Sequence, residues 1–290
     1  MKRGLTRTIP LLIVLAILNS IAHSQESNEI PPVYLPLLSR LSREGFETKF
    51  LSNIFIDPRA EIIPERMILY LVSRETTELY QQFLTPESIS HARTFLRQNR
   101  KLLRRMEDQF HVEMEVVSAI LLVESRFGEN IGKYRVIPTL ASMALMDSPE
   151  NLQKNYQVLK DTNAGLSYEW VEDFAKRKAG WAYDELKCFL NIVQQEKFDP
   201  LEVYGSYAGA LGMPQFIPSS YLAYAQSKKG LENWLLNKEE AIFSIGNYLK
   251  SHGWKKKMTT DKKRNILWYY NHSEPYVETI LQLARKIKQR

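Results

Sequence analysis

Residues 205–221 constrain the fold more than any other part of the chain. The run contains three glycines and two prolines among small residues, so it makes a poor helix interior and a poor strand. Such a run occurs where backbone must approach another element or a ligand closely. It also carries polar and aromatic side chains: Ser206, Gln215, Tyr207, Phe216 and Tyr221. This mixture suits a carbohydrate groove, although composition alone favours a tight loop between helices.

Residues 112–128 read as a helix in which one carboxylate lies on an apolar face. Gly128 is placed to end this helix as a left-handed cap, and Glu124 lies three residues before Phe127 on the apolar stripe. A carboxylate on such a face is costly unless it is neutral or paired, and Arg126 does not share its face. Two interpretations follow: a buried Glu satisfied by a distant partner, or an acid whose pKa is raised so that it can protonate a leaving group.

Four segments occur in an order that resembles one known family. They are residues 123–128, residues 205–221, residues 244–249 before Gly253 and Trp254, and residues 270–273 before Tyr276. Together they are similar to the membrane-bound lytic murein transglycosylase B family, whose catalytic core is lysozyme-like. The resemblance runs from about residue 38 to residue 290. It implies a mainly α fold, with a lysozyme-like core and an additional N-terminal helical region.

The resemblance also implies a reaction and a set of site residues. The reaction is cleavage of the β-1,4 bond between N-acetylmuramic acid and N-acetylglucosamine in peptidoglycan, which leaves 1,6-anhydromuramoyl ends. Glu124 matches the family's single catalytic acid. Arg177 and Lys178 fall where the family usually has two arginines, and the second position departs from that pattern. The remaining positions that match substrate-binding residues are Ser206, Gln215, Tyr248, Tyr270, Asn271 and Tyr276.

One carboxylate is enough for this chemistry because the sugar's own C6 hydroxyl replaces the attacking water. Two alternatives remain open from the sequence: a hydrolytic muramidase, in which water intercepts the intermediate, and an inactive peptidoglycan-binding scaffold. The expected partners are peptidoglycan glycan strands, with other cell-wall enzymes as candidates and no nucleic acid. The formal net charge of +6 permits an anionic wall polymer as partner without identifying one.

The N-terminus has the pattern of a secretory signal peptide over residues 1–24. Basic Lys2, Arg3 and Arg7 precede a short apolar run, and small residues follow it. The alternative is an uncleaved anchor, although the run is short for a membrane span. Residues 25–37 read as a linker. We therefore expect an exported protein, periplasmic or extracellular, and not a lipoprotein, because no cysteine lies near the cleavage site.

The rest of the chain reads as helices without a regular run of strands. We expect a helical N-terminal region at 38–110, a catalytic core at 111–256 and a C-terminal helical segment at 257–290 that completes the groove. Residues 88–109 read as one helix with a basic face, and Ser273 is placed to cap the last helix. Residues 148–174 form a longer connection than the family norm, and their sequence fits either an ordered lid or a mobile loop.

No cofactor and no metal site are expected. The five histidines show no paired spacing for zinc. Related proteins often carry an Asp-rich calcium loop, but here residues 226–233 are shorter and carry Lys228 and Lys229 where oxygen ligands would be needed.

Overall fold

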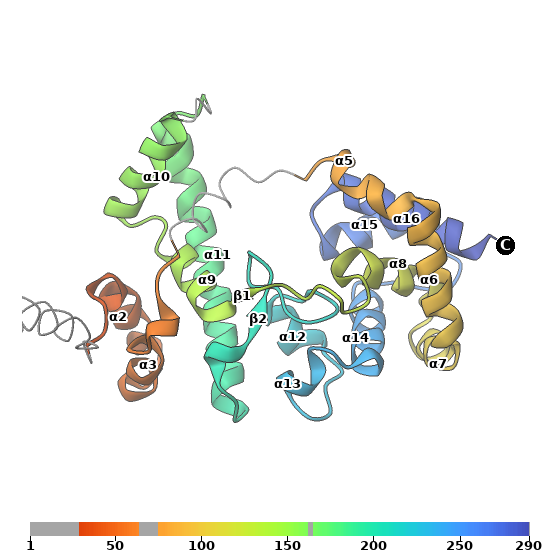
Figure 1. Cartoon of the computed structure of the whole chain (residues 1–290), viewed down its shortest axis with the longest axis horizontal. Helices are drawn as coiled ribbons and strands as arrows, with labels where there is room; N and C mark the ends of the chain where they lie inside the picture. The colour runs from red at the N-terminus through yellow and green to blue at the C-terminus, as the bar shows by residue number, and fades with distance from the viewer. Residues whose placement is uncertain (1–28, 64–74, 162–164, 290) are drawn as a thin grey trace, which may run out of the picture.

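The computed structural model describes residues 29–63, 75–161 and 165–289. The predicted signal peptide at 1–24 lies outside these residues. Within them the fold is mainly helical, as the sequence predicts, and the helices gather into two groups separated by a thin central layer (Figure 1). None of the helices in these ranges is both long and apolar enough to cross a membrane.

The first lobe is built around a buried helix. Its elements are η1 (Pro32–Tyr34), α2 (Leu35–Arg43), α3 (Thr48–Phe55), η2 (Pro58–Ala60), α9 (Val136–Ala144), α10 (Pro149–Asp161) and α11 (Tyr168–Gln195). Every residue of α9 is buried, and α9 packs along α11. The apolar composition of α9 is what places this helix in the centre of the lobe.

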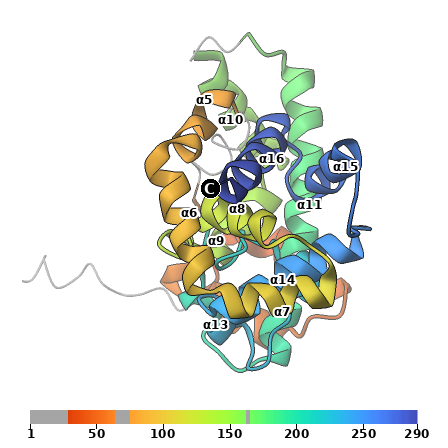
Figure 2. The ribbon, with the colours of Figure 1, turned by 90° about the vertical axis from the view of Figure 1, so that its right-hand side faces the viewer.

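The second lobe contains the chain's other long helices. Its elements are α5 (Thr77–Gln81), η3 (Gln82–Leu84), α6 (Pro86–Gln98), α7 (Arg100–Phe110), α8 (Met114–Ser125), α14 (Lys238–Ser251), α15 (Thr260–Tyr270) and α16 (Glu274–Lys288). Helix α8 packs against α6 and α16, and α7 packs against α14 (Figure 2). The N-terminal helical region therefore divides between both lobes.

The glycine-rich run forms the layer between the lobes. Strand β1 (Tyr134–Arg135) pairs antiparallel with β2 (Tyr204–Gly205), and single bridges continue through Leu211 to Phe216. The short elements η4 (Pro200–Glu202), α12 (Pro218–Tyr224) and α13 (Leu231–Trp234) complete it. A Cβ at Gly132 would stand 1.9 Å from the carbonyl oxygen of Gly205, so this backbone approach requires glycine.

Three expectations about helix boundaries are corrected. The linker ends before Pro32, because Tyr34 and Leu37 are buried and belong to the first lobe. The predicted helix at 88–109 is two helices, since the Asn99 amide donates to the carbonyl of Phe95 and ends α6. Helix α8 ends at Ser125, where left-handed backbone begins at Arg126, two residues before the predicted glycine cap.

The long connection at 148–174 is largely helical. It contains α10 and the start of α11, and residues 162–164 between them lie outside the described part of the chain. The rings of Tyr156 and Tyr168 meet edge to face at 5.1 Å, which joins the two helices. Phe174, near the start of α11, reaches the groove between the lobes. The sequence left open whether this segment is a lid or a loop, and its described residues form a helical hairpin.

Candidate active site

Glu124 lies at the penultimate position of α8 and is contacted by the last helix. The hydroxyl of Tyr276, in α16, donates a hydrogen bond of 2.7 Å to Glu124 Oε1. Tyr276 is placed there because the Ser273 hydroxyl caps α16 by accepting from the Tyr276 amide, as the sequence predicts. Residues 152 positions apart thus meet at one carboxyl group.

The surroundings of Glu124 favour its neutral form. The pKa of this carboxyl is raised to about 8, mainly by burial; the hydrogen bond from Tyr276 lowers the pKa, and the nearby charge of Glu75 adds a smaller rise. A carboxyl group with this pKa is largely protonated at neutral pH. Glu124 can therefore donate a proton and take one back under the same conditions.

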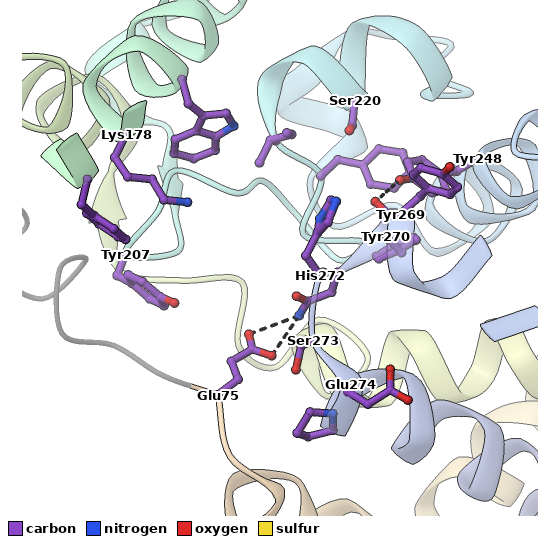
Figure 3. Close-up of a pocket in the computed structure, with 16 residues that line it drawn as sticks. Glu75, Lys178, Tyr207, Ser220, Tyr248, Tyr269, Tyr270, His272, Ser273 and Glu274 are labelled. Atoms are coloured by element: carbon purple, nitrogen blue, oxygen red, sulfur yellow. Dashed lines mark hydrogen bonds between the residues drawn. The ribbon is translucent and has the colours of Figure 1, made fainter. Parts of the chain in front are cut away.

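A groove of about 930 Å³ lies between the lobes (Figure 3). Its lining includes Tyr270 and Pro275, the residue that precedes Tyr276 in the chain. The hydroxyl of Tyr248 donates to the carbonyl oxygen of Tyr269 at 2.6 Å, and that of Tyr270 donates to the carbonyl oxygen of Pro214 at 2.7 Å. The rings of Tyr270 and Tyr276 are stacked at 6.3 Å, which connects the groove wall to the residue that contacts Glu124. The second lobe thus presents a rigid aromatic wall.

The first lobe supplies a cation to the opposite side of the groove. The Lys178 ammonium points into the groove near Tyr207 (Figure 3) and lies 5.7 Å and 5.9 Å from the ring centres of Phe174 and Trp181. Burial, together with the neighbouring charge of Arg177, lowers the pKa of Lys178. A partly desolvated cation between aromatic rings suits the amide and carboxyl oxygens of a substituted sugar.

The predicted site residues divide into three groups. Lys178, Tyr248, Tyr270 and Asn271 line the groove. Glu124 and Tyr276 form the hydrogen-bonded pair behind it. The third group, Ser206, Gln215 and Arg177, does not line the groove.

Ser206 and Gln215 shape the loop that carries the groove wall. The Ser206 hydroxyl accepts from the amides of Ala208 and Ala210, both at 3.1 Å. The Gln215 side chain, on backbone with φ of 52°, donates to the carbonyl of Gly212 at 2.8 Å and to that of Ile131 at 3.2 Å. Arg177 is exposed on α11 and is not among the residues that line the groove, whereas Lys178 lines it.

The structure also brings in residues that the sequence analysis did not assign as site residues, although it named Tyr207 among the aromatic side chains of residues 205–221. Tyr207 and Tyr269 line the groove with 41% and 58% of their surface exposed, which suits contact with a sugar. Their place in aromatic-rich segments was the signal that could have identified them. Glu75, far from every motif, also lines the groove, and no local pattern marks it.

The described residues contain no group of three or more His, Cys, Asp or Glu side chains able to hold a metal ion. The groups that this site offers are the Glu124 carboxyl with its raised pKa, the groove carboxylates Glu75 and Glu274, tyrosine hydroxyls and Lys178.

Comparison with known proteins places this geometry in a family. The sequence matches the family described as transglycosylase SLT domain over residues 37–266, which is most of the chain. The chain belongs to this transglycosylase SLT domain family. The resemblance seen in the sequence is thereby confirmed.

Individual relatives support the same assignment. The membrane-bound lytic murein transglycosylase B of Escherichia coli K12 is 32% identical over 179 residues, which is 61% of this chain and 41% of that protein. The match thus spans well under half of the length of that relative.

Two solved structures share the SLT-domain fold. E. coli lytic transglycosylase Slt35 with bulgecin A has a TM-score of 0.68 at 21% identity, covering 88% of this chain and 92% of that one. SltB3 from Pseudomonas aeruginosa with NAG-anhNAM-pentapeptide has a TM-score of 0.66 at 18% identity, covering 86% and 77%. These likenesses establish the lysozyme-like lytic transglycosylase fold.

Proposed function

We propose that this protein is a lytic transglycosylase that cleaves the β-1,4 bond between N-acetylmuramic acid and N-acetylglucosamine in peptidoglycan. The observation that carries the proposal is Glu124, whose pKa is raised to about 8, mainly by burial, and whose partner Tyr276 stacks on Tyr270 in the groove wall. Membership of the SLT domain family and the glycan-peptide ligand of the similar SltB3 structure support the same substrate.

Glu124 acts first as an acid. Its proton moves to the glycosidic oxygen while the bond from C1 of N-acetylmuramic acid to that oxygen breaks, and the bonding electrons leave with the N-acetylglucosamine hydroxyl. The N-acetyl group stabilises the positive charge that develops at C1. The Tyr276 hydrogen bond stabilises the Glu124 carboxylate formed in this step.

Glu124 then acts as a base. The C6 hydroxyl oxygen of the same muramoyl residue attacks C1, its proton returns to the Glu124 carboxylate, and a 1,6-anhydro bond closes. No water is consumed, and the acid is regenerated for the next cycle. The hydroxyl is tethered to the reacting carbon, so it competes well against water if the groove keeps water away.

The groove residues have separate roles in this proposal. Tyr248, Tyr270 and Asn271 contact the glycan from the second lobe, and Lys178 contacts its polar substituents from the first. Ser206 and Gln215 act through the loop that they hold in place, since their hydrogen bonds are to its backbone. Arg177 tunes Lys178 by its charge.

Product chemistry tests the proposal directly. Purified peptidoglycan is digested, and the soluble muropeptides are analysed by mass spectrometry before and after borohydride treatment. We expect anhydromuramoyl ends, which borohydride does not reduce. Mainly reducible muramoyl ends would establish the hydrolytic alternative, and intact glycan with retained binding would establish the scaffold.

We propose further that the protein is exported to the cell envelope, and that its mature form begins near Gln25 without an acyl chain. The basic and apolar pattern of residues 1–24 supports this. N-terminal sequencing of the protein recovered from the envelope tests it. Recovery of Met1 on a membrane-held protein would identify the first residues as an anchor.

A further inference from the structure

Glu75 is a carboxylate that lines the groove, on the segment that leads into α5. Its Oε1 and Oε2 accept from the Asn271 amide at 3.2 and 3.4 Å, and the Tyr80 hydroxyl also donates to Oε2 (Figure 3 shows the contacts with Asn271). Asn271 lies in the turn between α15 and α16, and Tyr80 belongs to α5. One exposed side chain therefore ties together two segments 196 residues apart.

The hydrogen bonds of Glu75 with Tyr80 and Asn271 form what we call the Glu75 clamp. A short chain of aromatic contacts connects this clamp to Glu124. The rings of Tyr80 and Tyr276 meet edge to face at 6.1 Å, and the Tyr276 hydroxyl donates to Glu124. Tyr80 is buried, so its orientation depends on the partners of its hydroxyl, which are Glu75 and Ser273. The position of Tyr276 is thus supported through Tyr80 by a residue that lies at the groove surface.

We propose that Glu75 is a positioning residue of this active site, whose carboxylate holds Tyr80 and Asn271 so that Tyr276, Glu124 and the groove wall keep one geometry. The inference rests on the proposed transglycosylase function.

Glu75 also acts on Glu124 through its charge. The ionisable groups that face Glu124 are Tyr276 from α16, Tyr80 from α5, Tyr270 from α15 and Glu75 itself. The three tyrosines have pKa values raised above the usual value by burial, so they are neutral at working pH. Glu75 is the member of this set that carries a charge, and its negative charge raises the pKa of Glu124.

A second groove carboxylate provides a matched control. Glu274 lines the same groove but forms ion pairs with Arg264 rather than a contact with Tyr80 or Asn271. Its charge is not among the causes of the raised pKa of Glu124. Glu274→Gln therefore removes one groove charge without touching the clamp.

The experiment compares the pH dependence of kcat/KM for the full chain and for Glu75→Gln, Glu75→Asp and Glu274→Gln, with peptidoglycan as substrate. Removing the charge of Glu75 lowers the pKa of Glu124. Glu75→Gln should therefore move the alkaline limb of the kcat/KM profile to lower pH, by about half a pH unit or more. Its kcat should fall about 3- to 10-fold with a smaller change in KM, because the acid loses its positioning.

Glu75→Asp keeps the charge and should keep the alkaline limb, while its shorter reach still lowers kcat. Glu274→Gln should leave the alkaline limb of kcat/KM at the same pH, even if its kcat changes. The proposal would be overturned if Glu75→Gln had the same alkaline limb of kcat/KM and the same kcat as the unchanged protein. So would an equal shift in Glu274→Gln, which would indicate a general effect of groove charge.

Failure of the proposed function would look different. In that case the unchanged protein itself would release reducible muramoyl ends or no soluble products, instead of anhydromuramoyl ends. Melting curves of the variants separate a folding defect from a positioning effect, because Glu75 is exposed and Gln preserves its size.

Discussion

At the scale of single residues, the active site depends on one carboxyl group that the fold keeps neutral. Glu124 lies at the end of a helix whose other face is core, and it accepts a hydrogen bond from Tyr276. Desolvation outweighs that hydrogen bond, so its pKa is raised to about 8. The same burial that makes the residue useful for catalysis makes it costly for folding.

Replacement of Glu124 should therefore separate activity from stability. Glu124→Gln keeps the shape but has no transferable proton, and we expect turnover to fall at least about 100-fold while glycan binding persists. The folded-state pKa of Glu124 is above the unfolded value of 4.5, so its ionisation penalty is absent below pH 4.5 and fully developed above about pH 8.

Glu124→Gln should thus stabilise the protein by on the order of 2 kcal/mol at pH 8 and by much less at pH 5. Turnover assays and thermal melting at both pH values check this. Near-normal cleavage by the variant would remove Glu124 from the mechanism.

Tyr276 should affect the pH profile in the direction opposite to Glu75. Its hydrogen bond lowers the pKa of Glu124, so Tyr276→Phe should raise that pKa and move the alkaline limb of kcat/KM to higher pH. The rate should fall at the same time, because the carboxylate formed on proton transfer loses its donor. The measurement is the pH profile with peptidoglycan, and a limb that moves to lower pH would contradict the geometry described above.

At the scale of elements, the groove depends on a few places where backbone meets backbone. Strands β1 and β2 contribute only two residues each, yet they join the segment after α8 to the glycine-rich run. Gly132 stands against Gly205 at this junction. Small residues here are a condition for forming the groove wall.

Two glycine substitutions can test whether this close backbone approach requires glycine. Gly132 and Gly45 both have positive φ, of 97° and 100°, but an added Cβ would clash with backbone only at Gly132. Gly45→Ala should cost about 1 kcal/mol from backbone strain alone. Gly132→Ala should cost roughly 1–3 kcal/mol more. Denaturant unfolding gives both values, and equal losses would show that the junction can shift without strain.

At the scale of the whole molecule, two lobes face each other across one groove. Lys178 and Tyr207 lie on one side of the groove and the tyrosines of the second lobe on the other, so the groove is lined from both sides (Figure 3). The N-terminal region contributes to both lobes, and α11 contacts α12 between them. The relative position of the lobes is therefore set by several contacts distributed along the chain.

Calcium should not stabilise this molecule. In the loop at 226–233, the Lys228 ammonium lies 3.6 Å from Glu239 and its amide donates to Glu240, so these groups are paired within the protein. A bound ion would stabilise the folded state by about 2.7 kcal/mol at 100 times its Kd. We expect millimolar calcium to change the Tm no more than magnesium does. A calcium-specific rise that a chelator abolishes would contradict this.

The sequence by itself determined those features of the protein that depend on residues close together in the chain. It located the helix that carries Glu124, the Ser273 cap and the groove loop, and it established the family and the mainly helical fold. Helical periodicity, caps and glycine runs are properties of neighbouring residues, so they can be read without coordinates.

Only the tertiary structure decided which distant side chains meet. It placed Tyr276 on Glu124 and Glu75 on Tyr80 and Asn271, and it left Arg177 outside the groove while Lys178 lines it. It also turned Ser206 and Gln215 toward backbone. The raised pKa of Glu124 arises from burial by segments far apart in the chain, and burial of this kind depends on packing that no local pattern records.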